Sequence, residues 1–378
     1  MTIYFVAGEA SADNHGAALM RCLRELDSQL EFVGRGGPQM QAIAGEQFKN
    51  WIGEAAVLGL WEVIRKYGYF REQFHKTLRE IRENKPDAVV LIDYPGFNLR
   101  LARALRQQAP RQKIIYYISP QVWAWDRGRI KRMAQFIDVV LCIFPFEADL
   151  YNKAGLRAAF VGHPMIERLQ GREIHTERDQ NVIGLFPGSR SREVRKIFPV
   201  MLETARGLKN YNPKLRFEVA AASKQLAREM TASGGKLDQS QGEKAIQIKV
   251  GETAELMQRA WAGIVASGSA TLEAAYFRLP FVLVYKVAWP TYVAARLVVS
   301  VKYLGMPNLL ADKQVVPEFI QHRAKSNALV KAMQRLIENA NARQEMISQF
   351  NEIIAQLGEM GASEKAARAI IEEIGSTS

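Results

Sequence analysis

Short apolar runs alternate with longer amphipathic segments along most of this chain. In its first half the runs are IYFVAG, DAVVLID, KIIYYIS, DVVLCIF and AAFVGH, and helical patterns such as ALMRCLREL and FREQFHKTLREIREN lie between them. Strands that are apolar throughout and separated by helices are typical of a parallel sheet covered by helices on both faces. The alternation therefore predicts an α/β fold.

The alternation lapses once, in the polar stretch GHPMIERLQGREIHTERDQ, and resumes with NVIGLFPGS, RFEVAAAS, IQIKV, AGIVAS and PFVLVYKV. A chain of 378 residues is long enough for two domains. We therefore expect two facing Rossmann-like domains, residues 1–168 and 180–350, joined by a linker. Residues 351–378 are expected to form a helical tail that packs back on the first domain.

Charge and cysteine content narrow the class of protein. The net charge of +12 favours an anionic partner, such as a nucleotide, a phosphorylated metabolite, nucleic acid or an anionic lipid surface. The basic residues are scattered and no nucleic-acid-binding motif is recognisable, so we expect no nucleic-acid partner. Cys22 and Cys142 lie in apolar contexts and are interpreted as buried thiols of a reducing cytoplasm. We recognise no signal peptide, no spanning helix and no metal-binding cluster.

Polar residues directly after the apolar runs are the candidate site residues, because ligands of open α/β sheets bind at the carboxyl ends of the strands. Gly8, Glu9 and Ser11 follow the first run, in the turn GEASAD. Asp93 ends the buried run of LIDYPGFN, where partial burial should raise its pKa and suit it to act as a general base. The structural alternatives are that Ser11 or Asp13 caps the next helix and that Asp93 forms an Asx turn or a cap.

An aromatic pair follows a later strand, in the segment YYISPQVWAWDRGRIKR. Trp123 and Trp125 are interpreted either as platforms that stack on a base or sugar or as wedges inside the domain. The basic residues beside them indicate a phosphate or an anionic surface, with a solvated helix face as the alternative.

The segment GLFPGSRSREVRK is the sharpest signal in the second half. A strand ends in Gly188, Ser189 and Arg190, and a helix follows at once. Glycine lets the backbone approach a ligand, the free N–H groups of a helix start favour an anion, and an arginine binds phosphate with two parallel hydrogen bonds. The turn therefore predicts a phosphate site.

A second turn of this kind is VASGSATLEAAY, with Ser267 and Gly268 at the strand end and Thr271 and Glu273 in the following helix. The hydroxyls suit a phosphate and the carboxylate suits ribose hydroxyls, although a plain helix cap is the alternative. Two such turns favour a nucleotide diphosphate. No Asp-x-Asp pair occurs in the chain, so Arg190 and the helix N-termini are expected to neutralise the diphosphate without metal.

The apolar and aromatic segment AAVLGLWEVIRKYGYF has two interpretations. It is either a core helix or an amphipathic lip that contacts a membrane or admits acyl chains. The lip would be formed by its large apolar side chains, Leu58, Leu60, Trp61, Val63 and Ile64.

In their order and spacing, these motifs resemble those of the lipid-A-disaccharide synthase family over nearly the whole chain. The resemblance rests on VAGEASAD, FVGRGGPQM, LGLWEV, LIDYPGFN, YYISPQVWAW, FPFE, VGHP, LFPGSR, ASGSATLE, VYKVAWPTY and GMPNLLA. The family consists of membrane-associated, inverting glycosyltransferases of the GT-B fold. The resemblance implies transfer of a diacylated glucosamine from UDP to the 6-hydroxyl of diacylglucosamine 1-phosphate, which gives lipid A disaccharide 1-phosphate and UDP.

The resemblance also assigns roles to residues. It implies a peripheral enzyme on the anionic cytoplasmic face of the inner membrane of a Gram-negative-type bacterium. We expect neither a metal nor a cofactor, and we expect the protein to be a monomer or a homodimer. Relatives often carry a second acid three residues after Asp93, where this chain has Gly96, so Asp93 or else Glu9 must serve as base. The nearest alternatives are a UDP-sugar epimerase and a peptidoglycan-type N-acetylglucosaminyl transferase. The residues implied to line the site are Gly8, Glu9, Ser11, Asp93, Arg190, Ser267, Gly268, Thr271, Glu273 and Asn308.

Overall fold

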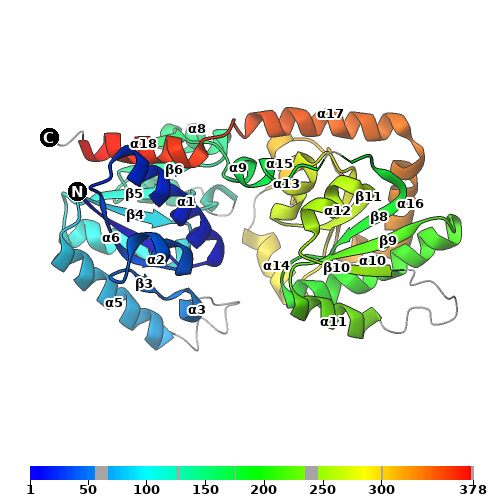
Figure 1. Ribbon diagram of the computed structural model, residues 1–378, viewed down its shortest axis with the longest axis horizontal. Coiled ribbons are helices and arrows are strands. Elements are labelled where there is room, and N and C mark those ends of the chain that lie inside the picture. The colour runs from blue at the N-terminus through cyan, green and yellow to red at the C-terminus, as the bar shows by residue number, and fades with distance from the viewer. Residues whose placement is uncertain are drawn as a thin grey trace. The chain divides into compact units, whose positions relative to one another are not determined.

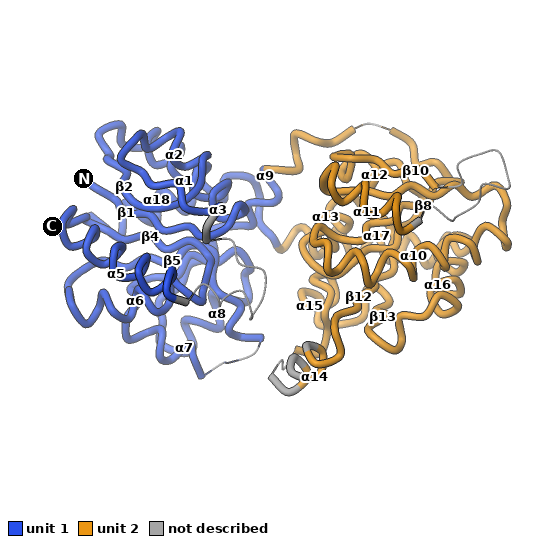
Figure 2. The backbone as a smooth tube through the Cα atoms, turned by 90° about the horizontal axis from the view of Figure 1, so that it is seen from below, with its two compact units in different colours: residues 1–167, 357–378 blue, residues 168–356 orange. Residues whose placement is uncertain are grey.

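The computed structural model describes residues 1–55, 67–124, 126, 128–174, 176–234, 246–298 and 301–375 (Figure 1). The chain divides into two compact units (Figure 2). Unit 1 comprises residues 1–167 and 357–378, and unit 2 comprises residues 168–356. The predicted apolar lip, Leu58, Leu60, Trp61, Val63 and Ile64, lies outside the described residues, as does Trp125.

Unit 1 is built on a seven-stranded parallel sheet with the strand order β3–β2–β1–β4–β5–β6–β7. Its strands are β1 Thr2–Ala7, β2 Glu31–Gly36, β3 Lys49–Asn50, β4 Ala88–Ile92, β5 Lys113–Tyr117, β6 Val139–Cys142 and β7 Ala158–Phe160. All five residues of β4 are buried, as expected for a strand covered on both faces. The strand order reverses between β1 and β4, which places the turns that follow these two strands at the switch point of the sheet.

Two apolar clusters attach the helices of unit 1 to the two faces of this sheet. Residues of α1, α2 and α18 pack on one face, and residues of α5, α6, α7 and α8 pack on the other. The C-terminal helix α18 lies against α1 (Figure 1). The helices are α1 Ala10–Leu26, α2 Pro38–Ala44, α3 Ile52–Ala55, α5 Tyr67–Asn84, α6 Pro95–Gln108, α7 Gly128–Met133, α8 Pro145–Lys153 and α18 Ala362–Gly375, with a 3₁₀ turn at Val122–Ala124. Helix α9, Met165–Gln170, contains the boundary between the two units.

Unit 2 repeats this design with a six-stranded parallel sheet in the order β10–β9–β8–β11–β12–β13. Its strands are β8 Asp179–Phe186, β9 Arg216–Ala221, β10 Ile246–Val250, β11 Ala260–Ala266, β12 Phe281–Tyr285 and β13 Glu318–Ile320. Here the order reverses between β8 and β11, so the switch point lies at the turns that follow those two strands.

The helices of unit 2 include the first of the two long C-terminal helices. The predicted tail begins at residue 351, inside α17, which belongs to unit 2, whereas α18 belongs to unit 1. The helices are α10 Ser191–Tyr211, α11 Lys224–Gly234, α12 Thr253–Arg259, α13 Ser269–Tyr276, α14 Trp289–Val298, α15 Met306–Ala311, α16 Ser326–Glu338 and α17 Ala340–Gln356, with a 3₁₀ turn at Gln321–Arg323.

The two parallel sheets with helices on both sides confirm the predicted fold class. Of the two cysteines, Cys142 is buried as predicted, whereas Cys22 is only partly buried. In the part of the chain that the structure describes, no helix combines the length and the apolar character needed to cross a membrane.

Candidate active site

The two turns at the switch point of unit 1 touch each other. Gly8 is buried in the turn after β1, and a Cβ there would come within 2.4 Å of Cδ1 of Tyr94, which follows β4. Only glycine therefore lets the two turns approach this closely. Glu9 directly precedes α1 in an extended conformation and is exposed, as is Ser11 in the first turn of that helix.

The backbone of Asp93 is held in an unusual conformation. Asp93 and Tyr94 have φ angles of +46° and +52°, in the left-handed region that few non-glycine residues adopt. The carbonyl oxygen of Asp93 accepts a hydrogen bond from the Tyr116 hydroxyl at 2.5 Å and another from Nδ2 of Asn98 at 2.8 Å. The neighbouring strand and the following helix thus fix the backbone at Asp93. Helix α6 begins after Tyr94, so Asp93 is not its N-cap.

The surroundings of Asp93 favour its protonated form. Burial, and secondly the negative charge of Glu9, raise the pKa of Asp93 to about 6, against an opposing hydrogen bond from the backbone of Tyr94. Burial and the charge of Glu9 also raise the pKa of the Tyr94 hydroxyl to about 12. Glu9, Asp93 and Tyr94 therefore share one electrostatic environment, in which Asp93 can take up a proton near neutral pH.

Asp13 does not cap the helix in which it lies, which was one of the structural alternatives. Its buried carboxylate accepts hydrogen bonds of 3.0 Å from the backbone N–H groups of Gly37, Gln39 and Met40. These groups belong to the N-terminus of α2. Of the alternatives for this turn, capping of α1 by Asp13 is therefore excluded, because its side chain caps α2 instead.

The loop after β5 is fastened by helix α8. Nε1 of Trp123 donates to Oε1 of Glu147 at 2.9 Å, and the Tyr151 hydroxyl donates to the carbonyl oxygen of Pro120 at 2.7 Å. Trp123 is buried, so it is the wedge of the two alternatives and not a stacking platform. Burial raises the pKa of Glu147 to about 7. Sequence reasoning missed Glu147, although an acid three residues into a helix that starts with Phe-Pro-Phe is a sign of an N-terminal anchor.

A cavity of about 400 Å³ lies at the switch point of unit 2. Six of the predicted residues line it, from the turn after β8, the turn after β11 and the following helix α13. They are Gly188, Ser189, Arg190, Ser267, Gly268 and Glu273, joined by Arg168, Arg172, Phe186, Glu193, Ala220, Ala222, Gly251, Thr253, Ala254, Ala266, Ser269 and Ala270.

Two glycines shape the wall of this cavity. Gly188 has a φ of +103° and Gly268 a φ of +135°, conformations that side-chain-bearing residues rarely adopt. A Cβ on Gly188 would lie 3.4 Å from Oε2 of Glu193, whereas a Cβ on Gly268 would meet open space. At both turns the backbone itself faces the cavity, as in sites that bind phosphate through N–H groups.

Two arginines that line this cavity form ion pairs with glutamates of the same lining. Arg190 pairs with Glu193, with 3.3 Å between Nη1 and Oε1, and Arg168 pairs with Glu273, with 2.7 Å between Nη2 and Oε1. Arg168 thus holds Oε1 of Glu273, whose side chain is 15% exposed and lines the cavity.

Thr271 and Asn308 are absent from the lining of this cavity. The Thr271 hydroxyl is buried and donates to the carbonyl oxygen of Gly268 at 2.7 Å. Oδ1 of Asn308 accepts from the backbone N–H groups of Val315 and Val316, each at 2.7 Å, and its Nδ2 donates to Oε1 of Glu318 at 2.9 Å. In this structure both side chains hold the backbone around the site, so their predicted contacts with the nucleotide stay predictions.

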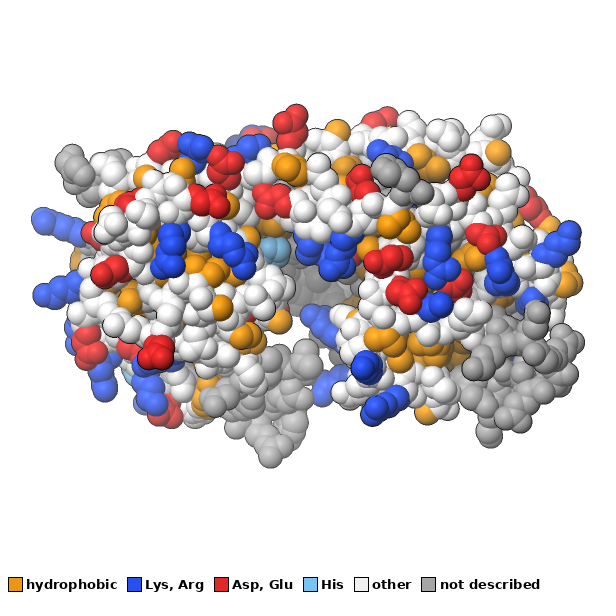
Figure 3. All heavy atoms as spheres, viewed as in Figure 1, with side chains coloured by type: hydrophobic (Ala, Val, Ile, Leu, Met, Phe, Trp, Pro, Cys, Tyr) orange, Lys and Arg blue, Asp and Glu red, His pale blue; other side chains and the backbone are white. Residues whose placement is uncertain are grey.

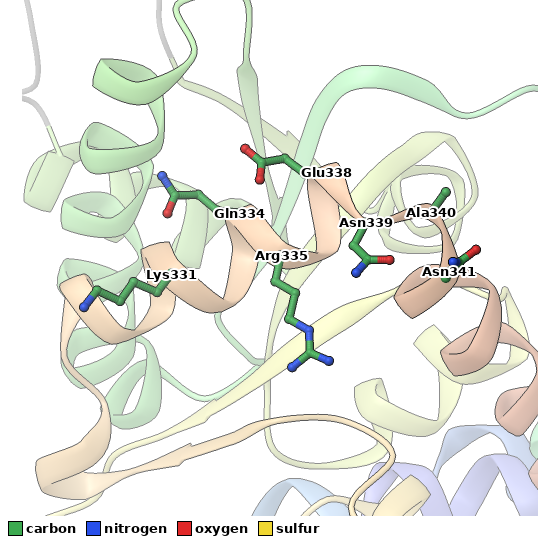
Figure 4. A pocket seen from close by; sticks show the side chains of 7 residues that line it. All are labelled: Lys331, Gln334, Arg335, Glu338, Asn339, Ala340 and Asn341. Carbon is green, nitrogen blue, oxygen red and sulfur yellow. The ribbon is translucent and has the colours of Figure 1, made fainter.

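Another hollow, of about 620 Å³, lies where α16 meets α17 (Figure 4). Figure 4 shows it framed by polar side chains of consecutive helix turns, and it contains none of the predicted site residues. Its lining is Lys331, Gln334, Arg335, Glu338, Asn339, Ala340 and Asn341. On the face drawn in Figure 3, Lys and Arg side chains are mixed with Asp and Glu, in agreement with the scattered charge of the sequence.

The model of the lipid-A-disaccharide synthetase family matches residues 3–372. The chain belongs to this family. The lipid-A-disaccharide synthase of Geobacter sulfurreducens is 36% identical over 385 residues, covering 99% of this chain and 97% of that protein. The synthase of Acidobacterium capsulatum is 37% identical over 376 residues, covering 96% of this chain and 93% of that protein. As a member of the lipid-A-disaccharide synthase family, the chain is a glycosyltransferase of lipid A biosynthesis, as predicted.

Solved structures share the GT-B type of fold with this lipid-A-disaccharide synthase family member. The UDP-GlcNAc 2-epimerase of Neisseria meningitidis, bound to UDP-GlcNAc, has a TM-score of 0.64 at 12% identity and covers 98% of this chain and 100% of its own. MurG of Acinetobacter baumannii has a TM-score of 0.59 at 14% identity and covers 98% of this chain and 99% of its own. At such low identity these likenesses show the fold alone.

The structure also shows the surroundings of Gly96, which stands where the resemblance implies an acid in relatives. Gly96 lies in the first turn of α6, three residues after Asp93, and is exposed. A Cβ built there would meet nothing within 4 Å. The second acid that the resemblance implies for relatives would therefore find open space at this position of the chain.

Proposed function

We propose that this chain transfers a diacylated glucosamine from UDP to the 6-hydroxyl of diacylglucosamine 1-phosphate, with Asp93 of unit 1 as the base and the cavity of unit 2 as the donor site. The products are lipid A disaccharide 1-phosphate and UDP. The main support is that the switch point of each unit carries side chains or backbone groups suited to one half of the reaction of this family. Unit 1 presents a carboxylate of raised pKa, and unit 2 presents glycine turns with arginines.

The donor half of the proposal rests on the charge and shape of the cavity in unit 2. Backbone N–H groups at Gly188 and Gly268 and the guanidinium of Arg190 would bind the diphosphate and stabilise the negative charge on UDP as it leaves. The carboxylate of Glu273 would accept hydrogen bonds from the ribose hydroxyls. Ser189 and Ser267 line the same wall and would donate to phosphate oxygens.

The acceptor half of the proposal rests on Asp93. The 6-hydroxyl oxygen forms a bond to the anomeric carbon while the bond from that carbon to the diphosphate oxygen breaks, which inverts the anomeric centre. The hydroxyl proton passes to the carboxylate of Asp93, whose pKa of about 6 leaves it ionised at pH 7 and basic enough to accept a proton. The negative charge of Glu9 would stabilise the positive character that develops on the sugar ring.

We place the protein peripherally on the anionic cytoplasmic face of the inner membrane, as a monomer or homodimer. The support is the charge of α6 and α7, which cover the same face of the sheet in unit 1 (Figure 2). Arg100, Arg103 and Lys131 are exposed on these helices, and neither helix contains an acidic residue. Such a surface is attracted to anionic lipid headgroups.

The decisive experiment is UDP release by the purified protein in detergent, with UDP-diacylglucosamine as donor, diacylglucosamine 1-phosphate as acceptor and EDTA throughout. We expect turnover that requires the acceptor and collapses in Asp93→Asn. Turnover that survives in Asp93→Asn would move the base to another residue, with Glu9 the first to test. Isomerisation of a UDP-sugar without acceptor would instead favour an epimerase, and release of UDP only with a peptidoglycan-type acceptor would favour the other transferase.

A further inference from the structure

Residues 168–174, at the beginning of unit 2, contribute two arginines to the lining of the cavity, which the sequence did not indicate. Arg168 and Arg172 line the cavity together with Arg190. Arg168 lies in the last turn of α9, and Arg172 follows that helix, with its backbone N–H donating to the carbonyl oxygen of Leu169 at 2.9 Å. This segment precedes the turn at Gly188 by a short stretch of chain but lies far in sequence from the turn at Gly268, so the fold brings it to the second turn.

A single buried glutamine fixes the backbone directly after Arg172, from its carbonyl oxygen to the N–H of Ile174. Nε2 of Gln258, on α12, donates to the carbonyl oxygen of Arg172 at 2.8 Å, and Oε1 of Gln258 accepts from the N–H of Ile174 at 2.6 Å. Gln258 is 9% exposed and also donates to the carbonyl oxygen of Ala254 in its own helix at 3.1 Å. The neighbouring Glu173 is held as well, because the Tyr276 hydroxyl donates to its Oε1 at 2.7 Å. The segment that carries Arg172 is therefore fixed against α12 and α13.

Arg172 differs from the other two arginines of the cavity in its ion pairing. Two of its three arginines are paired with glutamates of the same wall, Arg168 with Glu273 and Arg190 with Glu193. Among the described residues, no carboxylate pairs with Arg172, whose side chain is exposed. The two ion pairs are formally neutral, so Arg172 supplies the remaining positive charge of the lining. A nucleoside diphosphate that enters the cavity brings two or three negative charges and needs such a group.

We infer that Arg172 binds the diphosphate of the nucleotide and that Gln258 positions it for this contact. The inference rests on the proposed function, because it assumes that the cavity of unit 2 is the nucleotide site. Arg172 is a binding residue of the donor, whereas Gln258 acts only through the backbone of residues 172–174. The ligand class that needs Arg172 is a nucleoside diphosphate, and a nucleoside without phosphates does not use it.

The test compares UDP with uridine on the full-length protein. UDP affinity is measured by titration calorimetry and uridine binding by ligand-observed NMR, for wild type, Arg172→Gln, Arg172→Lys and the control Arg206→Gln. Arg206 is exposed on α10 and does not line the cavity. We expect Arg172→Gln to weaken UDP binding about tenfold, which corresponds to about 1.4 kcal/mol, and to leave uridine binding unchanged. Arg172→Lys should recover part of the loss, and Arg206→Gln should bind both ligands as wild type does.

Gln258 is tested by a double-mutant cycle. Gln258→Ala should weaken UDP binding severalfold, and the double variant Arg172→Gln/Gln258→Ala should bind UDP no more weakly than Arg172→Gln alone. Melting temperatures of all variants show whether Gln258→Ala is folded. If it is not, Gln258→Glu, which keeps the acceptor but loses the N–H donor, takes its place.

The outcomes separate the two levels of the proposal. UDP binding by Arg172→Gln within twofold of wild type, or an equal loss for UDP and uridine, would overturn the role of Arg172. Additive losses in the double variant would overturn the role of Gln258. A wild-type protein that does not bind UDP would overturn the nucleotide site itself and with it the proposed function.

Discussion

The two switch points of this molecule solve the same local problem with different residues. In unit 1 the chain turns after β4 through Asp93 and Tyr94, two side-chain-bearing residues with φ angles of +46° and +52°. In unit 2 it turns after β8 and β11 through Gly188 and Gly268, with φ angles of +103° and +135°. The first pair lies within the small left-handed region that L-residues tolerate at a cost, whereas the second pair lies beyond it.

The difference follows from what each turn presents. A turn that must bring a carboxylate to the site needs a side chain, and the hydrogen bonds to the Asp93 carbonyl oxygen from Tyr116 and Asn98 offset the backbone strain. A turn that must bring backbone N–H groups to a phosphate needs the absence of a side chain. In the proposed function, unit 1 therefore presents a reactive group, and unit 2 presents a surface that holds an anion.

The sharpest way to break this comparison is Asp93→Asn. The amide fits the same left-handed conformation, since Asn adopts it readily, but it accepts no proton. We expect turnover to fall by roughly 10²- to 10⁴-fold, with UDP affinity unchanged because the cavity proposed to bind the nucleotide lies in unit 2. Steady-state UDP release and UDP titration check both.

The same variant tests the electrostatic cost of Asp93. A carboxyl group whose pKa is raised in the folded state binds more protons folded than unfolded, so its contribution to stability is present below about pH 4 and lost as the pH rises through about 6. A rise of about two units corresponds to at most about 3 kcal/mol. Asp93→Asn should therefore raise the melting temperature at pH 8 and have little effect at pH 4. A lower melting temperature at pH 8 would contradict the burial of an ionised Asp93.

The second prediction concerns the lipid side of unit 1. The double variant Arg100→Gln/Arg103→Gln removes two exposed charges from α6, and each is expected to contribute about 1 kcal/mol to binding at an anionic surface. Sedimentation with anionic vesicles at low salt should show roughly 30-fold weaker binding, and neutral vesicles should show no difference. The matched control is Arg206→Gln/Lys331→Gln in unit 2. An equal loss in the control would mean that the net charge, and not unit 1, carries the attraction.

The third prediction addresses the glycine turns of unit 2. Gly268→Ala places a Cβ in open space, so its effect comes from the φ of +135° alone. Forcing alanine into that conformation costs about 1–3 kcal/mol, which we expect to appear as about tenfold weaker UDP binding and a lower melting temperature. Gly68→Ala, in α5, also meets nothing within 4 Å but has no positive φ and serves as the control. UDP affinity of Gly268→Ala equal to wild type would show that the turn does not need glycine.

The fourth prediction uses Glu9 to tune Asp93 without removing it. Because the charge of Glu9 raises the pKa of Asp93, Glu9→Gln should lower that pKa and shift the acidic limb of the pH–rate profile to lower pH, by less than about one unit. The maximal rate should also fall if Glu9 stabilises positive charge on the sugar. UDP affinity should not change. A loss of UDP affinity would make Glu9 a residue of the nucleotide site or of the scaffold.

The sequence predicted the turns that carry both candidate sites, because the positions of these turns depend on local order. Alternating strands and helices predict parallel sheets, and the residues after the strands lie at the carboxyl edge, so Glu9, Asp93, Gly188 and Gly268 could be identified. Which two strands lie at a switch point is a property of the sheet order, which the alternation does not contain.

The sequence could not predict the roles of side chains whose hydrogen-bond partners lie far along the chain. Asp13 resembles a cap of its own helix, but its three N–H donors lie 24 to 27 residues away in α2. In the sequence, Trp123 resembles an exposed platform, but in the structure its Nε1 donates to the buried carboxylate of Glu147. Arg172 stands in a polar stretch that resembles any linker, and only Gln258, 86 residues away, reveals that its backbone is fixed.

The smallest effect is expected for a variant of Gly96, the position at which the resemblance implies an acid in relatives. Gly96 lies in the first turn of α6 with open space around its Cβ position, and an acid near a helix N-terminus is favourable. Gly96→Asp should therefore fold as wild type does, and its added charge should move the acidic limb of the rate profile to higher pH by a fraction of a unit. In the Asp93→Asn background, the same change should recover turnover by severalfold if position 96 reaches the acceptor hydroxyl. If turnover does not recover, the base must stand at the strand end itself, where Tyr116 and Asn98 fix the backbone, and the glycine of this chain is then no functional loss.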